Sequence, residues 1–184
     1  NRDWLFPYYR DMLTCLSAGI TPYELILNGL SKANDLASGG RHMSNHFAKH
    51  EIGIWNVSSA TGNHTLHAVG IARGAKTYGE DRIAFSSQGE SSTSEGYVYE
   101  ALNGASRERL PVIFVVQNNG YGISVPVSVQ SANPIVSENY RGLKNLLIVN
   151  CDGTNPFDSH RAMQEAVAYV RSGEGPALVH ALCR

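Results

Sequence analysis

The fold of this chain is decided by residues 82–122, which read RIAFSSQGESSTSEGYVYEALNGASRERLPVIFVVQNNGYG. An apolar strand at Arg82–Ser87 is followed by a Gly/Ser turn and by a helix from about Ser94 to Arg107. The run Pro111–Val116 is apolar at consecutive positions, which is typical of a parallel strand covered on both faces. This strand–helix–strand order predicts an α/β domain.

The alternation continues on both sides of this stretch. A helix of small residues begins near residue 62, and a strand at Leu146–Cys151 leads to a helix that begins near Pro156. A last strand is expected at Ala177–Leu182. We therefore predict a single α/β domain over residues 1–184, with a mostly parallel sheet flanked by helices.

The amino-terminal region gives weaker signals. Residues 3–18 predict a helix that ends at Gly19. The capping box Thr21-Pro22-Tyr23-Glu24, with proline at the first helical position, predicts a helix to about Asp35. The stretch Ser38–Ser59 has no clear period, and loops of that length inside a compact domain tend to be functional.

Composition excludes several classes of function. The formal net charge is -1, so no broad basic field is present to hold nucleic acid or an anionic membrane. The 3 cysteines lie far apart, which argues against a disulfide scaffold or a structural zinc site and favours a reducing compartment. No apolar stretch approaches the ~20 residues that cross a bilayer. We expect a fragment of a longer chain, cytoplasmic, or in the mitochondrial matrix if eukaryotic.

Two polar loops follow successive predicted strands, where parallel sheets bind ligands. One is Gln88–Gly96 and the other is Gln117–Gly122. Gly89 and the small serines allow backbone N–H groups to approach an anion, and the next helix directs its positive end there. Either loop alone would be an ordinary turn, but the two together indicate a binding site.

The same loops suggest a hard cation. Neither contains Lys or Arg to neutralise a bound phosphate, so a metal ion is the natural counter-charge. Glu90 offers a carboxylate, Asn119 an amide oxygen and Tyr121 a main-chain carbonyl, which are ligands that Mg²⁺ accepts.

The spacing of these loops resembles a known signature. Gly89-Glu90-Ser91, the 26 residues Ser92–Gln117 and then Asn118-Asn119 resemble the Gly-Asp-Gly…Asn-Asn pattern of thiamine-diphosphate enzymes. Further segments are similar to the α subunit of the decarboxylating component of 2-oxo acid dehydrogenase complexes: Tyr9-Arg10-Asp11, Gly40-Arg41-His42-Met43, Thr93-Ser94-Glu95-Gly96, Asn118–Pro126 and Gly173-Glu174-Gly175-Pro176. Glu at position 90, where most relatives have Asp, is closer to the branched-chain members.

The resemblance implies thiamine diphosphate and Mg²⁺ as cofactors. It places the metal at Glu90, Asn119 and the carbonyl of Tyr121, and the diphosphate at Tyr9 and Arg10. On residues alone Arg10 suits a solvated helix face, whereas the family position makes it the cation that both loops lack. Further cofactor contacts are implied at Gly89, Ser91, Ser92 and Gln117.

The resemblance also implies how the rest of the cofactor is held. Ser59 and Thr61 match the turn whose main chain meets the aminopyrimidine ring, although relatives often carry a larger apolar residue at position 61. His46 matches a catalytic histidine near the thiazolium ring.

Other histidines have simpler interpretations. His42, His46 and His50 recur every four residues, but the neighbouring glycines make a helix doubtful and a zinc site unfavoured. His64 and His67 are expected to be packing or surface residues.

Two positions depart from the family pattern. Ser91 replaces the second glycine, so the backbone must accept a Cβ close to the diphosphate. Gln117 replaces an arginine of some branched-chain members and leaves less positive charge. A histidine-bearing loop of the family would lie beyond Arg184.

By resemblance, the function is oxidative decarboxylation of a 2-oxo acid, with the branched-chain type favoured, and acyl transfer to a lipoyl-bearing acyltransferase. A β subunit or fused β-like domain would supply an activating glutamate, so we expect this chain alone to be inactive. The alternatives are a pyruvate or acetoin dehydrogenase α subunit, a transketolase-like enzyme, or a degenerate module kept for assembly. A dinucleotide-binding domain is disfavoured because no Gly-x-Gly-x-x-Gly motif follows a first strand.

Overall fold

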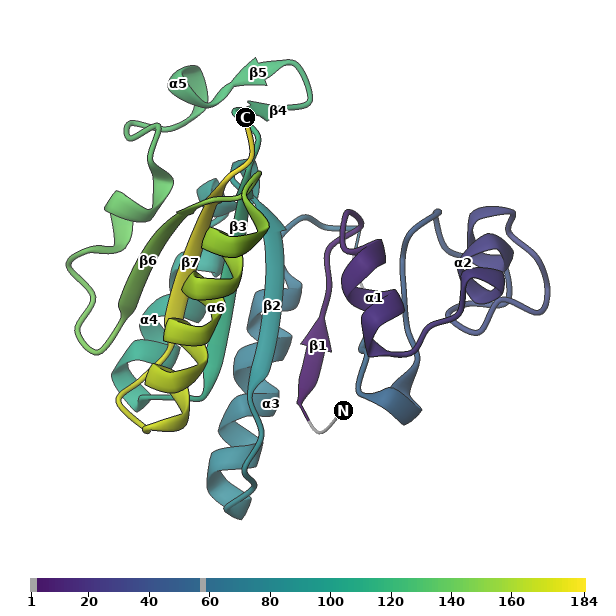
Figure 1. The fold of residues 1–184 in the computed structure, drawn as a ribbon, viewed down its shortest axis with the longest axis horizontal. Helices are drawn as coiled ribbons and strands as arrows, with labels where there is room; N and C mark the ends of the chain where they lie inside the picture. The colour runs from purple at the N-terminus through teal and green to yellow at the C-terminus, as the bar shows by residue number, and fades with distance from the viewer. Residues whose placement is uncertain (1–2, 57–58) are drawn as a thin grey trace.

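The centre of the molecule is a five-stranded sheet with the order β1-β2-β3-β7-β6 (Figure 1). The computed structural model describes residues 3–56 and 59–184. The strands are β1 Trp4–Phe6, β2 Ala84–Gly89, β3 Val112–Asn118, β6 Leu147–Asp152 and β7 Ala177–Leu182. All neighbouring strands pair in parallel, so their carboxyl ends meet at one edge and the predicted sheet is confirmed.

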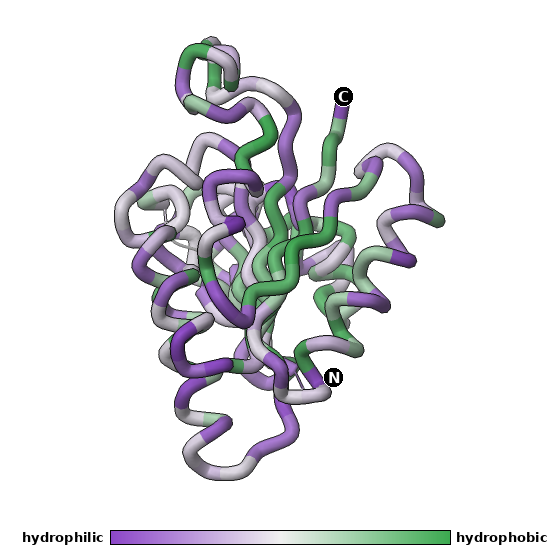
Figure 2. Tube along the Cα trace, turned by 90° about the vertical axis from the view of Figure 1, so that its left-hand side faces the viewer, coloured by the Kyte–Doolittle hydropathy of each residue, from purple (hydrophilic) through white to green (hydrophobic). Residues whose placement is uncertain are grey.

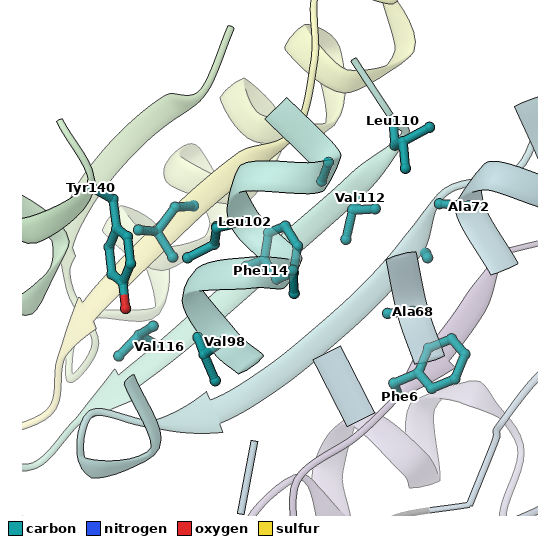
Figure 3. Close-up of a cluster of buried hydrophobic side chains, with 14 of the residues drawn as sticks. Phe6, Ala68, Ala72, Val98, Leu102, Leu110, Val112, Phe114, Val116 and Tyr140 are labelled. Carbon is teal, nitrogen blue, oxygen red and sulfur yellow. The ribbon is translucent and has the colours of Figure 1, made fainter. Parts of the chain in front are cut away.

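Helices cover both faces of this sheet (Figure 1). α3 (His64–Tyr78) and α4 (Gly96–Glu108) pack on one face, and α6 (Pro156–Arg171) packs on the other. Figure 3 shows Phe114 of β3 close to Leu102 of α4 in the first core. Each face of the sheet carries its own hydrophobic core, and alternate residues of β3 belong to one core or the other. This confirms that the strand is buried on both faces.

The remaining elements are short. They are α1 Met12–Ala18, α2 Pro22–Gly29, α5 Val127–Gln130, the antiparallel pair β4 Tyr121–Gly122 and β5 Val125–Pro126, and the 3-10 turns η1 His50–Ile52, η2 Ser91–Ser94 and η3 Val136–Tyr140. Apolar residues concentrate along the central strands (Figure 2), and β4, β5 and α5 lie beyond the carboxyl ends of the sheet, near the C-terminus (Figure 1). Within residues 3–56 and 59–184, every helix is too short or too polar to cross a membrane.

The predicted helix over residues 3–18 is wrong in its first half. Trp4–Phe6 forms strand β1, because Trp4 N–H donates to the carbonyl of Ile83 at 2.9 Å and joins the sheet. Pro7 then disfavours helical geometry at Phe6, so the helix begins only at Met12. This difference matters for the site, since a strand parallel to β2 carries Tyr9 and Arg10 to the carboxyl edge of the sheet.

The second predicted helix is confirmed at its start and ends early. Thr21 and Glu24 form the predicted capping box, but α2 ends at Gly29 instead of continuing to Asp35. The buried Asp35 carboxylate accepts hydrogen bonds from Ser38 Oγ at 2.8 Å and from the N–H of Ala37 at 3.1 Å, which organises a loop in place of another helical turn. The long loop predicted after it is confirmed over its described part, and residues 57–58 lie outside the described residues.

Thr21→Ala is expected to lower the free energy of unfolding by about 1 kcal/mol. Glu24 N–H donates to Thr21 Oγ1 at 3.2 Å, and that helix-end donor would lose its partner. Urea denaturation measures the change. Thr77→Ala is the matched control, because Thr77 is exposed near the end of α3 and bonds only the carbonyl of Arg73. Equal stabilities of the two variants would contradict the assignment of the cap.

Candidate functional site

The two predicted polar loops meet at the carboxyl edge of the sheet. Gln88–Gly89 and Gln117–Asn118 still belong to β2 and β3, which pair in register as far as Gly89 and Gln117. Glu90 and Asn119 therefore each stand directly after a strand, and Asn119 N–H donates to Glu90 Oε2 at 3.4 Å. The parallel pairing of β2 with β3 thus brings the Glu90 carboxylate and the main chain of Asn119 together.

Glu90 has the chemistry of a metal ligand. Its side chain is only 2% exposed, and Oε1 has no hydrogen-bond partner among the described residues. A buried carboxylate oxygen without a partner is costly unless a cation or proton meets it. Asn119 is exposed, and its Oδ1 accepts from Tyr121 N–H at 3.0 Å, so this amide oxygen lies in the turn that follows β3. These residues fit a hard cation such as Mg²⁺.

An open cavity of about 540 Å³ lies beside Glu90. Its volume is within the range of roughly 300–1,000 Å³ that is usual for ligand pockets. The cavity brings together eight of the residues predicted to contact the cofactor: Tyr9, Arg10, Thr61, Gly89, Glu90, Ser91, Ser92 and Tyr121. Segments that are far apart in sequence therefore build one site.

Arg10 supplies the cation of this cavity. Its guanidinium donates to the carbonyl of Gln117 at 3.4 Å and to the Tyr9 hydroxyl at 3.3 Å. It also lies 5.1 Å from the ring centre of Tyr8, which is close enough for a cation–π contact. The Tyr8 hydroxyl approaches Gly89 so closely that an added Cβ there would stand 3.3 Å from it. The arginine is therefore held in place before any ligand binds.

The pKa values of Tyr8 and Tyr9 are shifted by their surroundings. Burial raises the pKa of Tyr8, and a hydrogen bond from the Tyr8 hydroxyl lowers the pKa of Tyr9. Residue patterns did not single out Tyr8, because one tyrosine beside a proline carries no recognisable signal.

The side chain of Gln117, predicted as a cofactor contact, is engaged with neighbouring residues of this chain. Its side-chain amide donates to Asp11 Oδ1 at 2.6 Å and to Ser87 Oγ at 2.9 Å, and the side chain does not line the cavity. Asp11 also accepts from Tyr8 N–H at 2.7 Å, and burial raises the pKa of its carboxyl. Gln117 and Asp11 therefore join the turn that carries Arg10 to the end of β3.

Ser91 is accommodated by a facing glycine. A side chain at Gly122 would collide with Ser91 Oγ and Cβ, so the missing Cβ of Gly122 leaves room for the serine. The carbonyl of Ser91 accepts from Gln130 Nε2 at 2.9 Å, which fixes the turn from α5. The side chain at position 91, where the family pattern has glycine, thus occupies the space left by Gly122.

His46 and Ser59 lie next to each other, outside the cavity described above. His46 Nδ1 donates to the carbonyl of Ser44 at 3.1 Å, so Nε2 accepts from Ser59 Oγ at 3.0 Å. Ser59 lines a second cavity of about 640 Å³, together with His42 and Trp55. Thr61 lines the first cavity, so the turn at residues 59–61 contributes to both.

Thr61 faces the first cavity, and its carbonyl accepts from the Tyr97 hydroxyl at 2.7 Å. This bond ties the turn to α4, so the main chain at residues 59–61 has a fixed position relative to Glu90.

The other histidines do not form a metal site. His50 packs against Trp55 with ring centres 4.8 Å apart, while His42 packs edge-on against His46. Across the described part of the chain, no cluster of three or more His, Cys, Asp or Glu side chains could hold a metal. His64 is a packing residue as expected, since it is buried and donates to the carbonyl of Ser87 at 2.7 Å. His67 is exposed and lines the second cavity.

His180 on β7 is fully buried, and no pattern in the sequence singles it out. Burial, and then the charge of Arg184, lower its pKa to about 4, while Glu138 acts in the opposite direction. The imidazole is therefore neutral at physiological pH.

This pKa predicts a loss of stability in mild acid. Between about pH 6.5 and pH 4 the unfolded chain binds a proton at His180 and the folded chain does not. The free energy of unfolding should fall by up to about 1.4 kcal/mol per pH unit over that range, and the contribution should be constant above it. Urea denaturation at pH 7 and pH 5 should show a smaller difference in His180→Gln than in the unchanged protein. An equal difference would contradict the prediction, and His160→Gln, at an exposed position, is the control.

Comparison with known proteins gives the family. The family model described as dehydrogenase E1 component matches residues 1–184. The 2-oxoisovalerate dehydrogenase subunit alpha of Bacillus subtilis (strain 168) is 38% identical over 180 residues, covering 98% of this chain and 54% of that protein. The pyruvate dehydrogenase E1 component subunit alpha of the same strain is 30% identical over 182 residues, covering 99% of this chain and 46% of that protein. The chain thus spans about half the length of these curated relatives.

Solved structures confirm the fold. A transketolase from Leishmania mexicana superimposes with a TM-score of 0.71 at 17% identity, covering 99% of this chain and 28% of that one. A putative thiamin diphosphate-dependent enzyme from Mycobacterium smegmatis superimposes with a TM-score of 0.54 at 24% identity, covering 73% of this chain and 24% of that one. With the match along the whole sequence and the α subunits as relatives, the chain belongs to the dehydrogenase E1 component family.

Proposed function

We propose that this chain binds the diphosphate of thiamine diphosphate through Mg²⁺ held by Glu90, Asn119 and the main-chain carbonyl of Tyr121. The observation that carries the proposal is the buried Glu90, whose Oε1 is unpartnered among the described residues and lies at the cavity lined by Arg10. A diphosphate needs positive charge, and a metal ion together with one guanidinium supplies it without a broad basic surface.

In this proposal the chain binds and orients the cofactor, which when bound supplies carbonyl addition and uptake of the electrons of the lost carboxylate. Arg10 holds phosphate oxygens, and its contacts to Gln117 and Tyr9 reduce the entropy lost on binding. The main chain at Ser59 and Thr61 holds the aminopyrimidine ring. The Nδ1 atom of His46 contacts the carbonyl of Ser44, so Nε2 is the ring nitrogen directed toward Ser59 and the second cavity.

The proposed reaction is oxidative decarboxylation of a branched-chain 2-oxo acid, with acyl transfer to a lipoyl-bearing acyltransferase. It is supported by relatives named 2-oxoisovalerate and 3-methyl-2-oxobutanoate dehydrogenase subunit alpha, at 38% and 36% identity. Pyruvate is the second candidate substrate, supported by the pyruvate dehydrogenase relative at 30%. A β subunit or fused β-like domain would complete the site with a glutamate.

Calorimetric titration of thiamine diphosphate into the full-length protein with its partner subunit, with and without Mg²⁺, tests the binding step. We expect binding that requires the metal. If no binding is detected with the partner subunit present, the result would instead favour a non-catalytic module kept for assembly. A panel of 2-oxo acids, scored by kcat/KM, then separates branched-chain substrates from pyruvate.

The protein without its partner subunit is expected to show no turnover, because the activating glutamate is proposed to come from the β subunit or β-like domain. Turnover is measured as the CO₂ released from 2-oxoisovalerate. Addition of the partner subunit should restore activity. Turnover by the lone chain would contradict the shared site.

A further inference from the structure

Asn118, the first of the paired asparagines, lies in a buried hydrogen-bond network. Its Oδ1 accepts from Gly120 N–H at 2.9 Å, so its amide nitrogen must be the donor on the other side. This nitrogen donates to His180 Nε2 at 3.0 Å and to the carbonyl of Pro134 at 3.2 Å. Asn118 and His180 are both 0% exposed, so water cannot replace these partners.

The network fixes the tautomer of His180. Because Nε2 accepts from Asn118, the ring proton must lie on Nδ1, which faces Asn150 Oδ1 and Ser137 Oγ at 3.2 Å each. The Ser137 hydroxyl donates to the same Asn150 oxygen at 2.9 Å. A neutral histidine with this tautomer is therefore the acceptor that keeps the Asn118 amide in one orientation.

Asn118 in turn fixes the loop that carries the candidate metal ligands. Its bond to Gly120 N–H closes a turn around Asn119, and Gly120 has a φ of 87°, which favours glycine. Tyr121 N–H then donates to Asn119 Oδ1 at 3.0 Å. The carbonyl of Asn118 accepts from Cys183 N–H at 2.8 Å, which anchors the turn to the residue after β7. Rotation of the Asn118 amide would release the Gly120 bond and shift this turn.

We propose that His180 is a positioning residue for the metal ion, acting through Asn118 to hold the turn that presents Asn119 and the carbonyl of Tyr121 toward Glu90. The inference rests on the proposed function, because it requires a metal at those ligands. Residues that orient metal ligands without touching the metal typically contribute about 10- to 100-fold to metal affinity. The alternative is a network that only stabilises the fold.

Mn²⁺ binding followed by electron paramagnetic resonance distinguishes these two roles. The test uses the full-length chain assembled with its partner subunit, at saturating thiamine diphosphate. His180→Leu is expected to weaken Mn²⁺ binding at least about tenfold, because the Asn118 amide loses its acceptor. His180→Gln can present a carbonyl oxygen to that amide, and it should stay within about threefold of the unchanged protein.

Val170→Ala is the control for general destabilisation. Val170 is a buried residue of α6 that packs against the sheet, away from this loop, so the variant should lose stability and keep its Mn²⁺ affinity. A folded His180→Leu protein with unchanged Mn²⁺ affinity would overturn the inference.

If His180→Leu does not fold, Asn118→Ser takes its place. Serine can still accept from Gly120 N–H but cannot reach His180, so the same tenfold weakening is expected and unchanged affinity would again overturn the inference. Absence of Mn²⁺ binding in the unchanged protein would overturn the proposed function itself. If the unchanged protein binds Mn²⁺ and the variants bind it equally well, only the role of His180 would be overturned.

Discussion

Glu90→Gln is expected to weaken Mg²⁺-dependent binding of thiamine diphosphate at least about 100-fold, or about 2.7 kcal/mol. Glutamine keeps the size of the side chain and removes the only carboxylate proposed to meet the metal. Because Glu90 is 2% exposed, its charge acts with little screening by solvent. Calorimetric titration at fixed Mg²⁺, on the protein assembled with its partner subunit, measures the loss.

Glu95→Gln is the matched control for this prediction. Glu95 lines the same cavity but is exposed, so the same change of charge at its mouth should alter affinity by less than about threefold. Equal losses in the two variants would show that the cavity responds to net charge and that Glu90 is no metal ligand.

Arg10→Met should weaken thiamine diphosphate binding about 30- to 150-fold, which corresponds to about 2–3 kcal/mol for charge-assisted hydrogen bonds to phosphate. Methionine keeps much of the apolar stem against Tyr8 and Tyr9 and removes the guanidinium. Thiamine, which lacks the diphosphate, should bind the variant and the unchanged protein equally. Competition against a fluorescent thiamine analogue measures both affinities.

Arg41→Met serves as the comparison for Arg10. Arg41 is exposed, donates to the carbonyl of Ser38 and does not line the cavity, so its loss should leave the affinity unchanged. If Arg10→Met weakened thiamine as much as thiamine diphosphate, the guanidinium would not be a diphosphate ligand.

The parts of this structure that the sequence predicted are those with local or periodic signals. Pro111–Val116 is apolar at every position because both faces of β3 are covered, and that pattern is visible without a structure. The capping box at Thr21 is likewise a local arrangement of side chain and backbone. Glu90 and Asn119 were found through the spacing of two loops, and the parallel register of β2 and β3 explains why that spacing brings them together.

The parts that the sequence did not predict depend on contacts between distant segments. Strand β1 has only three residues, and pairing with Ala84–Ser86 decides its conformation. The side-chain amide of Gln117 donates to Asp11, which lies 106 positions away. His180 accepts a hydrogen bond from Asn118, which lies 62 positions away in the sequence. No period or local motif encodes such partners, because they are set by the order of strands in the sheet.

The shortness of β1 has a consequence for exchange with solvent. This strand has three residues and lies at the edge of the sheet. Its hydrogen bonds include those from the N–H groups of Trp4 and Leu5 to the carbonyls of Ile83 and Gly53 at 2.9 and 2.8 Å. Short elements at the edge of a fold open at free energies below that of global unfolding. When β1 opens, the turn with Arg10 leaves the cavity, so a ligand can bind only the closed form. Ligand at 100 times its Kd adds about 2.7 kcal/mol to the free energy of that opening. In native-state hydrogen–deuterium exchange, the amides of Trp4 and Leu5 should therefore slow by about 100-fold, and the amino-terminal edge would report cofactor occupancy.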